Sequence, residues 1–177
     1  MTVQGTGKLD ISLRDLLEYG NFGELHPGTP ESKIIATLGP FDNFHSPSEG
    51  AALRATWLYG SIEFWTVPVV LTDYLDVGYP NENICEGIFI EASGPDERGP
   101  FLFPENCSVI DWGLPSGTNS DAAIEYLHNN GFMEREAYPN SDPYTLIVEG
   151  SHVLLTFDDN RLHSIFVGLR TAHVAKL

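Results

Sequence analysis

Three two-residue turn signals, each beside short runs of β-branched and aromatic residues, constrain the fold of this chain more than any other feature. Two turns are Gly-Ser and one is Asp-Asn, residue types that tolerate the positive φ angles of tight hairpins. The turns are Gly60-Ser61, Gly150-Ser151 and Asp159-Asn160, and the runs beside them cover residues 54–59, 62–66, 144–149, 152–157 and 162–169, with a further run over 84–92. Short runs joined by tight turns pair in antiparallel order, so the sequence predicts a mainly antiparallel sheet.

Apolar residues at helical spacing mark three other segments, which we expect to form helices over residues 12–19, 29–38 and 121–129. Gly20 ends the first helix. Thr29 is the expected N-cap of the second, followed by Pro30 at the first helical position, and Ser120 is the expected N-cap of the third. Each helix has one apolar stripe to bury, and we place all three on one side of the sheet.

The order helix, strand, Gly-Ser turn, strand, strand occurs twice along the chain. Gly60-Ser61 and Gly150-Ser151 are 90 residues apart, and the Pro/Gly-rich segment 93–104 is the best boundary between the two occurrences. We therefore predict an α+β fold in a single domain, residues 1–177, with two αβββ-like halves covering about residues 1–97 and 98–177. Independent recurrence of the same hairpin chemistry is the alternative explanation.

Net charge restricts the partners that this chain can bind. Twenty-five acidic residues against nine basic ones give a formal charge of −16. Because each phosphate contact needs a cation, such a surface repels nucleic acid and anionic membranes. The charge serves either solubility or steered association with a basic protein partner. With no apolar window of membrane-spanning length and no signal peptide, we expect a cytoplasmic protein with Cys85 and Cys107 reduced.

The Gly60-Ser61 turn assigns the side chains of its hairpin to the two faces of the sheet. A two-residue loop places Tyr59 opposite Ile62 and Trp57 opposite Phe64, and opposed residues share a face, which we expect to be core. The other face receives Thr56, Leu58, Glu63 and Trp65 from this hairpin, and Ile147 and Leu154 from the second one. Both faces therefore carry apolar groups, although a sheet with helices on one side needs only one apolar face.

Two explanations of the second apolar face stay open. Either the long loops 73–83 and 93–119 cover it, or it binds a partner through an aromatic anchor surrounded by carboxylates. On the second explanation, the expected partner-binding residues are Trp65, Glu63, Leu58, Glu91, Asp96 and Glu97.

No sequence motif predicts a catalytic, metal or cofactor site. The segment 5–8 reads Gly-Thr-Gly-Lys but lacks the flanking residues of a phosphate loop. A turn at Asp159-Asn160 pairs Thr156 with His163, which leaves His152 and His163 out of register for a zinc pair. We therefore expect no catalytic residues, no metal and no cofactor. An enzyme with a spatially assembled site, or a regulatory module, stays the alternative, because such residues converge in space and not in sequence.

Several short motifs resemble known inhibitor families. Gly28-Thr29, Ile34-Ile35 and Leu38-Gly39-Pro40 resemble the helix signature of β-lactamase-inhibitory-protein-like αβββ modules. The segment 38–42, followed by Trp57-x-Tyr59-Gly60-x-Ile62-Glu63-Phe64, resembles bacterial immunity-type proteins encoded beside polymorphic toxins, and residues 122–168 share their pattern of helix, glycine and Asp-Asp-Asn-Arg-Leu-His-Ser-Ile. The resemblance implies a non-enzymatic inhibitor that blocks a cognate toxin, and it brings no catalytic residues.

Overall fold

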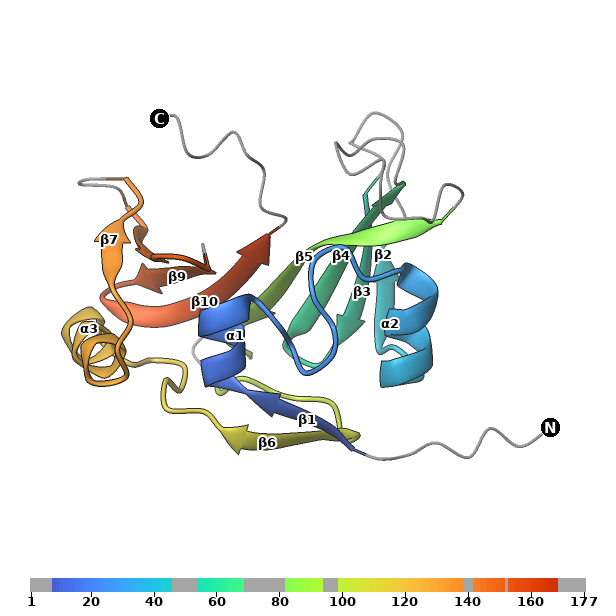
Figure 1. Ribbon diagram of the computed structural model, residues 1–177, viewed down its shortest axis with the longest axis horizontal. Helices are drawn as coiled ribbons and strands as arrows, with labels where there is room; N and C mark the ends of the chain where they lie inside the picture. Colours follow the sequence, from blue (N-terminus) through green and yellow to red (C-terminus); the bar gives the residue numbers. More distant parts are fainter. Residues whose placement is uncertain are drawn as a thin grey trace.

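Figure 1 shows the computed structural model of the chain, which describes residues 8–45, 54–68, 82–93, 99–138, 142–151 and 153–168. An eight-stranded sheet with the order β2-β3-β4-β5-β10-β9-β8-β7 dominates it. Its strands are β2 (Asn43–His45), β3 (Ala55–Tyr59), β4 (Ile62–Pro68), β5 (Asn83–Glu91), β7 (Glu134–Glu136), β8 (Tyr144–Val148), β9 (Val153–Asp158) and β10 (Arg161–Gly168). Every neighbouring pair in this sheet is antiparallel, which confirms the predicted α+β class.

Two four-strand meanders meet at the centre of the sheet, where β5 pairs with β10. Helix α2 (Glu31–Leu38) precedes the first meander, and helix α3 (Ser120–Asn129) precedes the second. Each meander therefore contains one strand more than the three expected. The additional strands, β2 and β7, are three residues long and mostly exposed at the two edges of the sheet, so no alternation of apolar residues marks them.

The tight turns form where they were predicted, and the residues next to them pair as expected. Gly60 has a φ of 63°, and Tyr59 pairs with Ile62 across it. Asp159 and Asn160 both have positive φ, 47° and 60°, the requirement of a type I′ turn. These two hairpins hold the meanders in register.

A β-bulge changes the register of β10. Leu162 pairs with Phe157, whereas the next pair is Ser164 with Thr156, so His163 is the extra residue. The predicted pairing of Thr156 with His163 is therefore wrong by one position. The extra residue exchanges the faces of all later side chains in β10: Ile165 and Val167 are buried in the core, and Phe166 pairs with Leu154 on the opposite face.

Two of the predicted helix caps are also wrong. Helix α1 (Leu13–Tyr19) has the expected stop at Gly20, and Ser12 caps its start. Pro30, not Thr29, is the N-cap of α2, because the Thr29 hydroxyl accepts a hydrogen bond from the His26 backbone N–H at 2.9 Å. Asn119, not Ser120, caps α3, and its side chain accepts from the Ala122 N–H at 2.8 Å.

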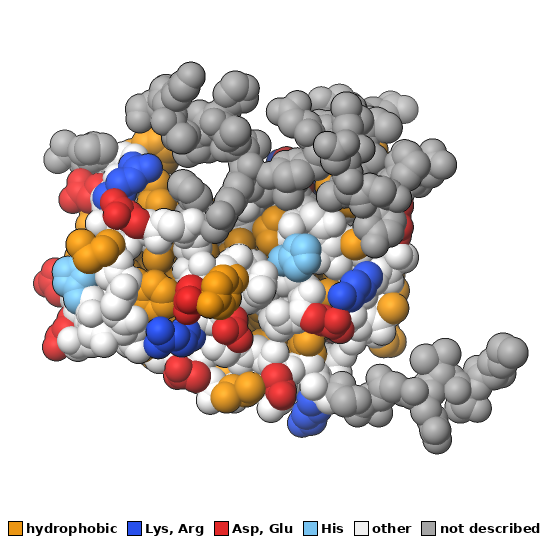
Figure 2. Space-filling view, viewed as in Figure 1, with side chains coloured by type: hydrophobic (Ala, Val, Ile, Leu, Met, Phe, Trp, Pro, Cys, Tyr) orange, Lys and Arg blue, Asp and Glu red, His pale blue; other side chains and the backbone are white. Residues whose placement is uncertain are grey.

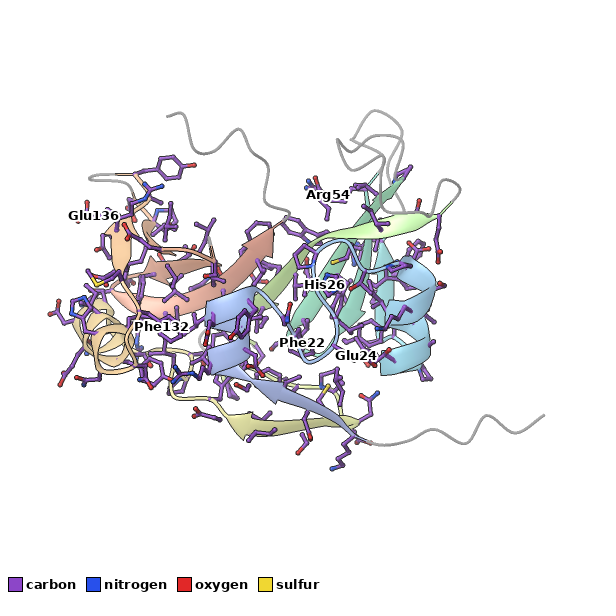
Figure 3. The ribbon with its side chains drawn as sticks, in the orientation of Figure 1. Phe22, Glu24, His26, Arg54, Phe132 and Glu136 are labelled. Atoms are coloured by element: carbon purple, nitrogen blue, oxygen red, sulfur yellow. The ribbon has the colours of Figure 1, made fainter. Side chains whose placement is uncertain are left out.

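One hydrophobic cluster joins the three helices to a single face of the large sheet. Its helical members are Leu13, Leu16, Leu17, Ile34, Leu38, Ala123 and Leu127. A small parallel sheet of β1 (Leu9–Ser12) and β6 (Cys107–Asp111) closes the cluster below the large sheet, and Phe22 lies between the two sheets (Figures 1 and 3). We call this face of the large sheet the core face.

The described part of the loop 93–119 packs on the core face, so this part does not cover the other face, as one of the two explanations required. Phe101 and Leu114 belong to the core cluster. Phe103 stacks on Phe22 with centroids 6.4 Å apart, and Phe22 contacts Phe64 of the core face. Residues 73–81 and 94–98 lie outside the described residues.

Both cysteines are unpaired and buried, in agreement with the prediction of reduced thiols. Burial raises the pKa of the Cys107 thiol to about 11, and it raises that of Cys85 still further. The protonated thiol is therefore the stable form at neutral pH, and it is a poor nucleophile. No helix among the described residues is long and apolar enough to cross a bilayer.

Candidate functional site

The candidate site is the sheet face opposite the core face, which we call the second face. One continuous row of paired residues crosses it from β3 to β8: Leu58, Glu63, Phe89, Phe166, Leu154 and Ile147. Ile147 is buried and the other five are half-buried, whereas Tyr59 and Phe64 on the core face are 2% and 0% exposed. None of these six side chains belongs to the core cluster that holds the described helices.

An aromatic cluster of Trp65, Phe89 and Phe166 occupies the centre of the second face. The Trp65 ring stacks on Phe89 with centroids 5.6 Å apart and planes 25° apart, and its centroid lies 5.3 Å from that of Phe166. Gly87 makes room for the cluster, since a Cβ there would lie 2.7 Å from the Phe166 ring. The cluster combines strands of both meanders, because Trp65 and Phe89 belong to β4 and β5 and Phe166 belongs to β10.

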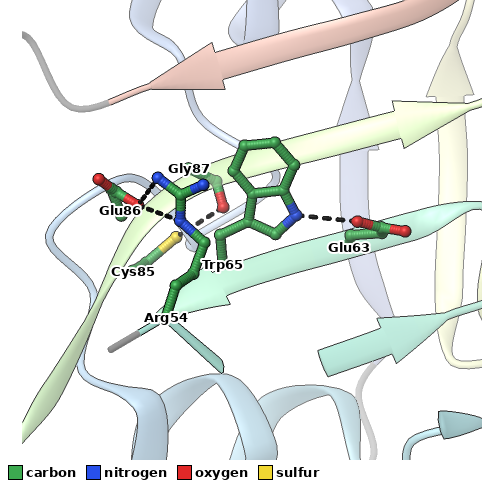
Figure 4. A network of polar contacts seen from close by, with 6 residues as sticks. All are labelled: Arg54, Glu63, Trp65, Cys85, Glu86 and Gly87. Carbon is green, nitrogen blue, oxygen red and sulfur yellow. Dashed lines mark hydrogen bonds and ion pairs between the residues drawn. The ribbon is translucent and has the colours of Figure 1, made fainter. Parts of the chain in front are cut away.

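Charged side chains border the Trp65 ring on two sides (Figure 4). Its indole Nε1 donates to Glu63 Oε2 at 2.8 Å. The guanidinium carbon of Arg54 lies 4.7 Å from the ring centroid, and its Nε and Nη2 both contact Glu86 Oε2 at 2.6 Å. Glu86 is the extra residue of a β-bulge in β5, where Trp65 pairs with Gly87 and Thr66 with Cys85. The bulge directs this carboxylate toward Arg54.

Four of the six predicted partner-binding residues lie among the described residues. Leu58, Glu63 and Trp65 lie together on the second face, as the Gly60-Ser61 turn predicts. Glu91 lies at the end of β5 on the same face, two residues beyond Phe89, and its Oε1 is 3.8 Å from His163 Nε2. Asp96 and Glu97 lie outside the described residues.

Sequence reasoning missed four residues of this site. Phe89 and Glu86 lie on a strand that was predicted, but without its pairing partner their faces were undetermined. The face of Phe166 could not be predicted, because the bulge at His163 shifts the register of β10 before it. Arg54 precedes β3, and its contact with Trp65, which the sequence does not show, is what assigns it to the site. Gly87 was the available signal in the sequence, because a glycine inside a strand often marks the close approach of another group. Phe89, two residues later, lies on the same face as Gly87.

A second aromatic group lies at the β2 edge of the sheet, on the core side. Trp57 contacts Phe41 and Phe44 with centroids 4.7 and 4.4 Å apart, and the two phenylalanines are 41% and 40% exposed. We call these three residues the edge cluster. Trp57 was expected to be core, but it is only half-buried, because β2 beside it is short and is the last strand of the sheet.

The edge cluster is attached to helix α2 through one carboxylate. Glu31 Oε2 accepts hydrogen bonds from Trp57 Nε1 at 3.1 Å, Thr66 Oγ1 at 2.6 Å and Asn83 Nδ2 at 3.1 Å. The donors come from three neighbouring strands, so Glu31 ties the first turn of α2 to the sheet.

Acidic side chains are scattered among apolar ones over the side of the molecule seen in Figure 2, and the few Lys and Arg side chains there lie apart from one another. Within the described residues, no group of three or more His, Cys, Asp or Glu side chains could hold a metal ion. The chain matches no known family model, and no curated protein or solved structure is significantly similar to it.

Proposed function

We propose that the protein is a non-enzymatic inhibitor that binds a basic protein through the second face. The aromatic cluster carries this proposal: Trp65, Phe89 and Phe166 gather on a sheet face to which no described helix contributes a buried side chain. Large, partly exposed rings surrounded by polar groups are typical of binding hot spots. Glu63 and Glu91 place carboxylates around the rings, so the surface has an apolar anchor and an acidic rim.

Net charge supports a basic partner. A charge of −16 attracts cationic proteins over about a Debye length and raises the rate of encounter. Carboxylates at the rim contribute more to this steering and to specificity than to affinity, whereas buried rings supply most of the affinity.

On this proposal the partner is a bacterial toxin, in line with the resemblance to immunity-type proteins. An acidic surface imitates an anionic substrate, so a basic nuclease toxin would accept it at the active site and be blocked. Protection of the producing cell requires the inhibitor in the compartment where the toxin acts, and we expect that to be the cytoplasm.

We also propose that the two meanders are two repeat units. Ile88-Phe89-Ile90 of β5 lies antiparallel to Ile165-Phe166-Val167 of β10, with Phe89 opposite Phe166. The strand order is symmetric about the β5-β10 pair, as expected for two repeat units related by a two-fold axis. The aromatic cluster then lies where the units meet, so a binding surface would need both units.

The product of the gene immediately upstream provides the test. We expect it to be a basic toxin that one equivalent of this protein inhibits. The association rate, measured by stopped-flow mixing, should fall about tenfold or more from low to physiological salt, because steering is screened. An upstream product that is neither bound nor inhibited would contradict the proposal, and a rate independent of salt would assign the charge to solubility.

A further inference from the structure

Arg54 is bound at the aromatic cluster in the way that a ligand would be. Its guanidinium lies over the face of Trp65, 4.7 Å from the ring centroid, and its Nε and Nη2 contact one oxygen of Glu86 at 2.6 Å. Glu63 accepts the indole N–H at 2.8 Å and so orients the ring from its edge. Figure 4 shows this arrangement, with the indole between the two carboxylates.

The geometry is selective for a guanidinium group. A flat, delocalised cation stacks on an indole face and donates in its own plane to a carboxylate, and both interactions strengthen as water is excluded. An ammonium group is a compact, strongly hydrated charge that cannot stack in this way. The indole and the Glu86 carboxylate therefore favour arginine over lysine.

Arg54 is held only weakly in its position over Trp65, so another cation could replace it there. Its side chain is 40% exposed and that of Glu86 is 33% exposed, so the ion pair is open to solvent. Such pairs add little to folding stability. Arg54 comes before the first residue of β3, so no strand pairing fixes its backbone. In Figure 3 it lies at the end of the sheet away from β1 and β6.

We propose that Trp65 and Glu86 form a subsite for an arginine side chain of the partner, and that Arg54 occupies this subsite in the free protein. The inference rests on the proposed function and deepens it by naming the group that the second face recognises. Arg54 then competes with the partner: it shields the apolar ring in the free protein and is displaced on binding.

Arg54→Ala empties the subsite, and a tri-arginine peptide is a suitable probe. By isothermal titration calorimetry, the variant should bind tri-arginine about fivefold or more tightly than the wild type, the size expected when one exposed cation–π contact and ion pair no longer compete. Lys33→Ala is the matched control, because it removes one positive charge from an exposed ion pair, Lys33 with Glu24, far along the chain from Trp65. It should leave the affinity at the wild-type value.

Two further comparisons test whether a gain in affinity for tri-arginine comes from the subsite. Arg54→Ala combined with Trp65→Ala should lose the gain, and tri-lysine should show none. Arg54→Gln, which retains the length of the side chain without its charge, repeats the measurement if Arg54→Ala lowers the melting temperature. An equal gain in Lys33→Ala, an equal gain with tri-lysine, or a gain that survives Trp65→Ala would overturn the arginine subsite.

Failure of this inference is distinguishable from failure of the proposed function. If Arg54→Ala gives no specific gain while Trp65→Ala still weakens binding of the upstream protein, only the arginine subsite is wrong. If Trp65→Ala leaves that binding unchanged, the second face is not the binding surface, and the subsite has no role in it.

Discussion

Trp57 and Trp65 lie on neighbouring strands of one hairpin, face opposite sides of the sheet, and each donates its indole N–H to a glutamate. Their acceptors differ. Glu31, which accepts from Trp57, begins helix α2 and also binds Thr66 and Asn83. Glu63, which accepts from Trp65, belongs to the same strand as the tryptophan itself.

On the proposed function, this difference distinguishes a tryptophan that stabilises the fold, Trp57, from one that binds the partner, Trp65. Removal of Trp57 takes away one of the three hydrogen bonds by which Glu31 ties helix α2 to the sheet, so its effect should appear in stability. Removal of Trp65 takes away contacts with Phe89, Phe166 and Arg54, which are all on the second face. Both rings are half-buried, so burial does not distinguish them. They differ in where their contacts come from: Trp57 contacts a helix, whereas Trp65 contacts residues of the second face.

Trp57→Ala should have the largest effect on stability. The variant loses the packing of Trp57 against Phe41 and Phe44 and one donor to Glu31. We expect a loss of about 3 kcal/mol, at the lower end for buried aromatic residues because the ring is half-buried. Urea unfolding at neutral pH would measure it. A loss below about 1 kcal/mol would show that the edge cluster is not part of the framework.

Glu31→Gln should destabilise by about 1–2 kcal/mol, because three hydrogen bonds to a carboxylate become bonds to a neutral amide. Glu63→Gln is the matched control, since among the described residues only the Trp65 indole donates to that carboxylate. It should change the free energy of unfolding by about 0.5 kcal/mol or less, because a single hydrogen bond is replaced by a similar one. Equal losses in the two variants would remove the distinction between the two tryptophan sites.

Gly87→Ala should destabilise by about 1 kcal/mol, because the new methyl group would lie 2.7 Å from the Phe166 ring and the ring must move. Combining it with Phe166→Leu should cost less than the sum of the two single changes, because the smaller side chain relieves the contact. Strict additivity in thermal unfolding would show that the glycine does not position the ring.

Local chemistry made the first hairpin predictable. Gly60-Ser61 fixes a two-residue loop, and this loop alone decides that Trp57 and Trp65 face opposite sides. The turns and helix stops follow the same logic, since glycine and Asx residues mark them in the sequence. The same turn also predicts that Leu58 and Glu63 face the same side as Trp65.

Long-range contacts account for most of what the sequence did not predict. The bulges at Glu86 and His163 depend on strand pairing that no local pattern specifies, and they decide the positions of Glu86 and Phe166. Strand β1 pairs with β6, almost a hundred residues later in the chain, and the short strand β2 has no apolar alternation. The edge cluster was therefore missed, and with it the half-exposure of Trp57.

Binding and unfolding measured together on Trp65→Ala test the central claim most directly. Against the upstream protein, the variant should lose about 2 kcal/mol or more of binding free energy, roughly a thirtyfold increase in Kd. Its melting temperature should fall by only about 3 °C, as for about 1 kcal/mol in a domain of this size. Trp57→Ala, measured below its melting temperature, should bind with the wild-type Kd. A Trp65→Ala variant that binds normally but unfolds as easily as Trp57→Ala would contradict the account, because the second face would then be part of the framework.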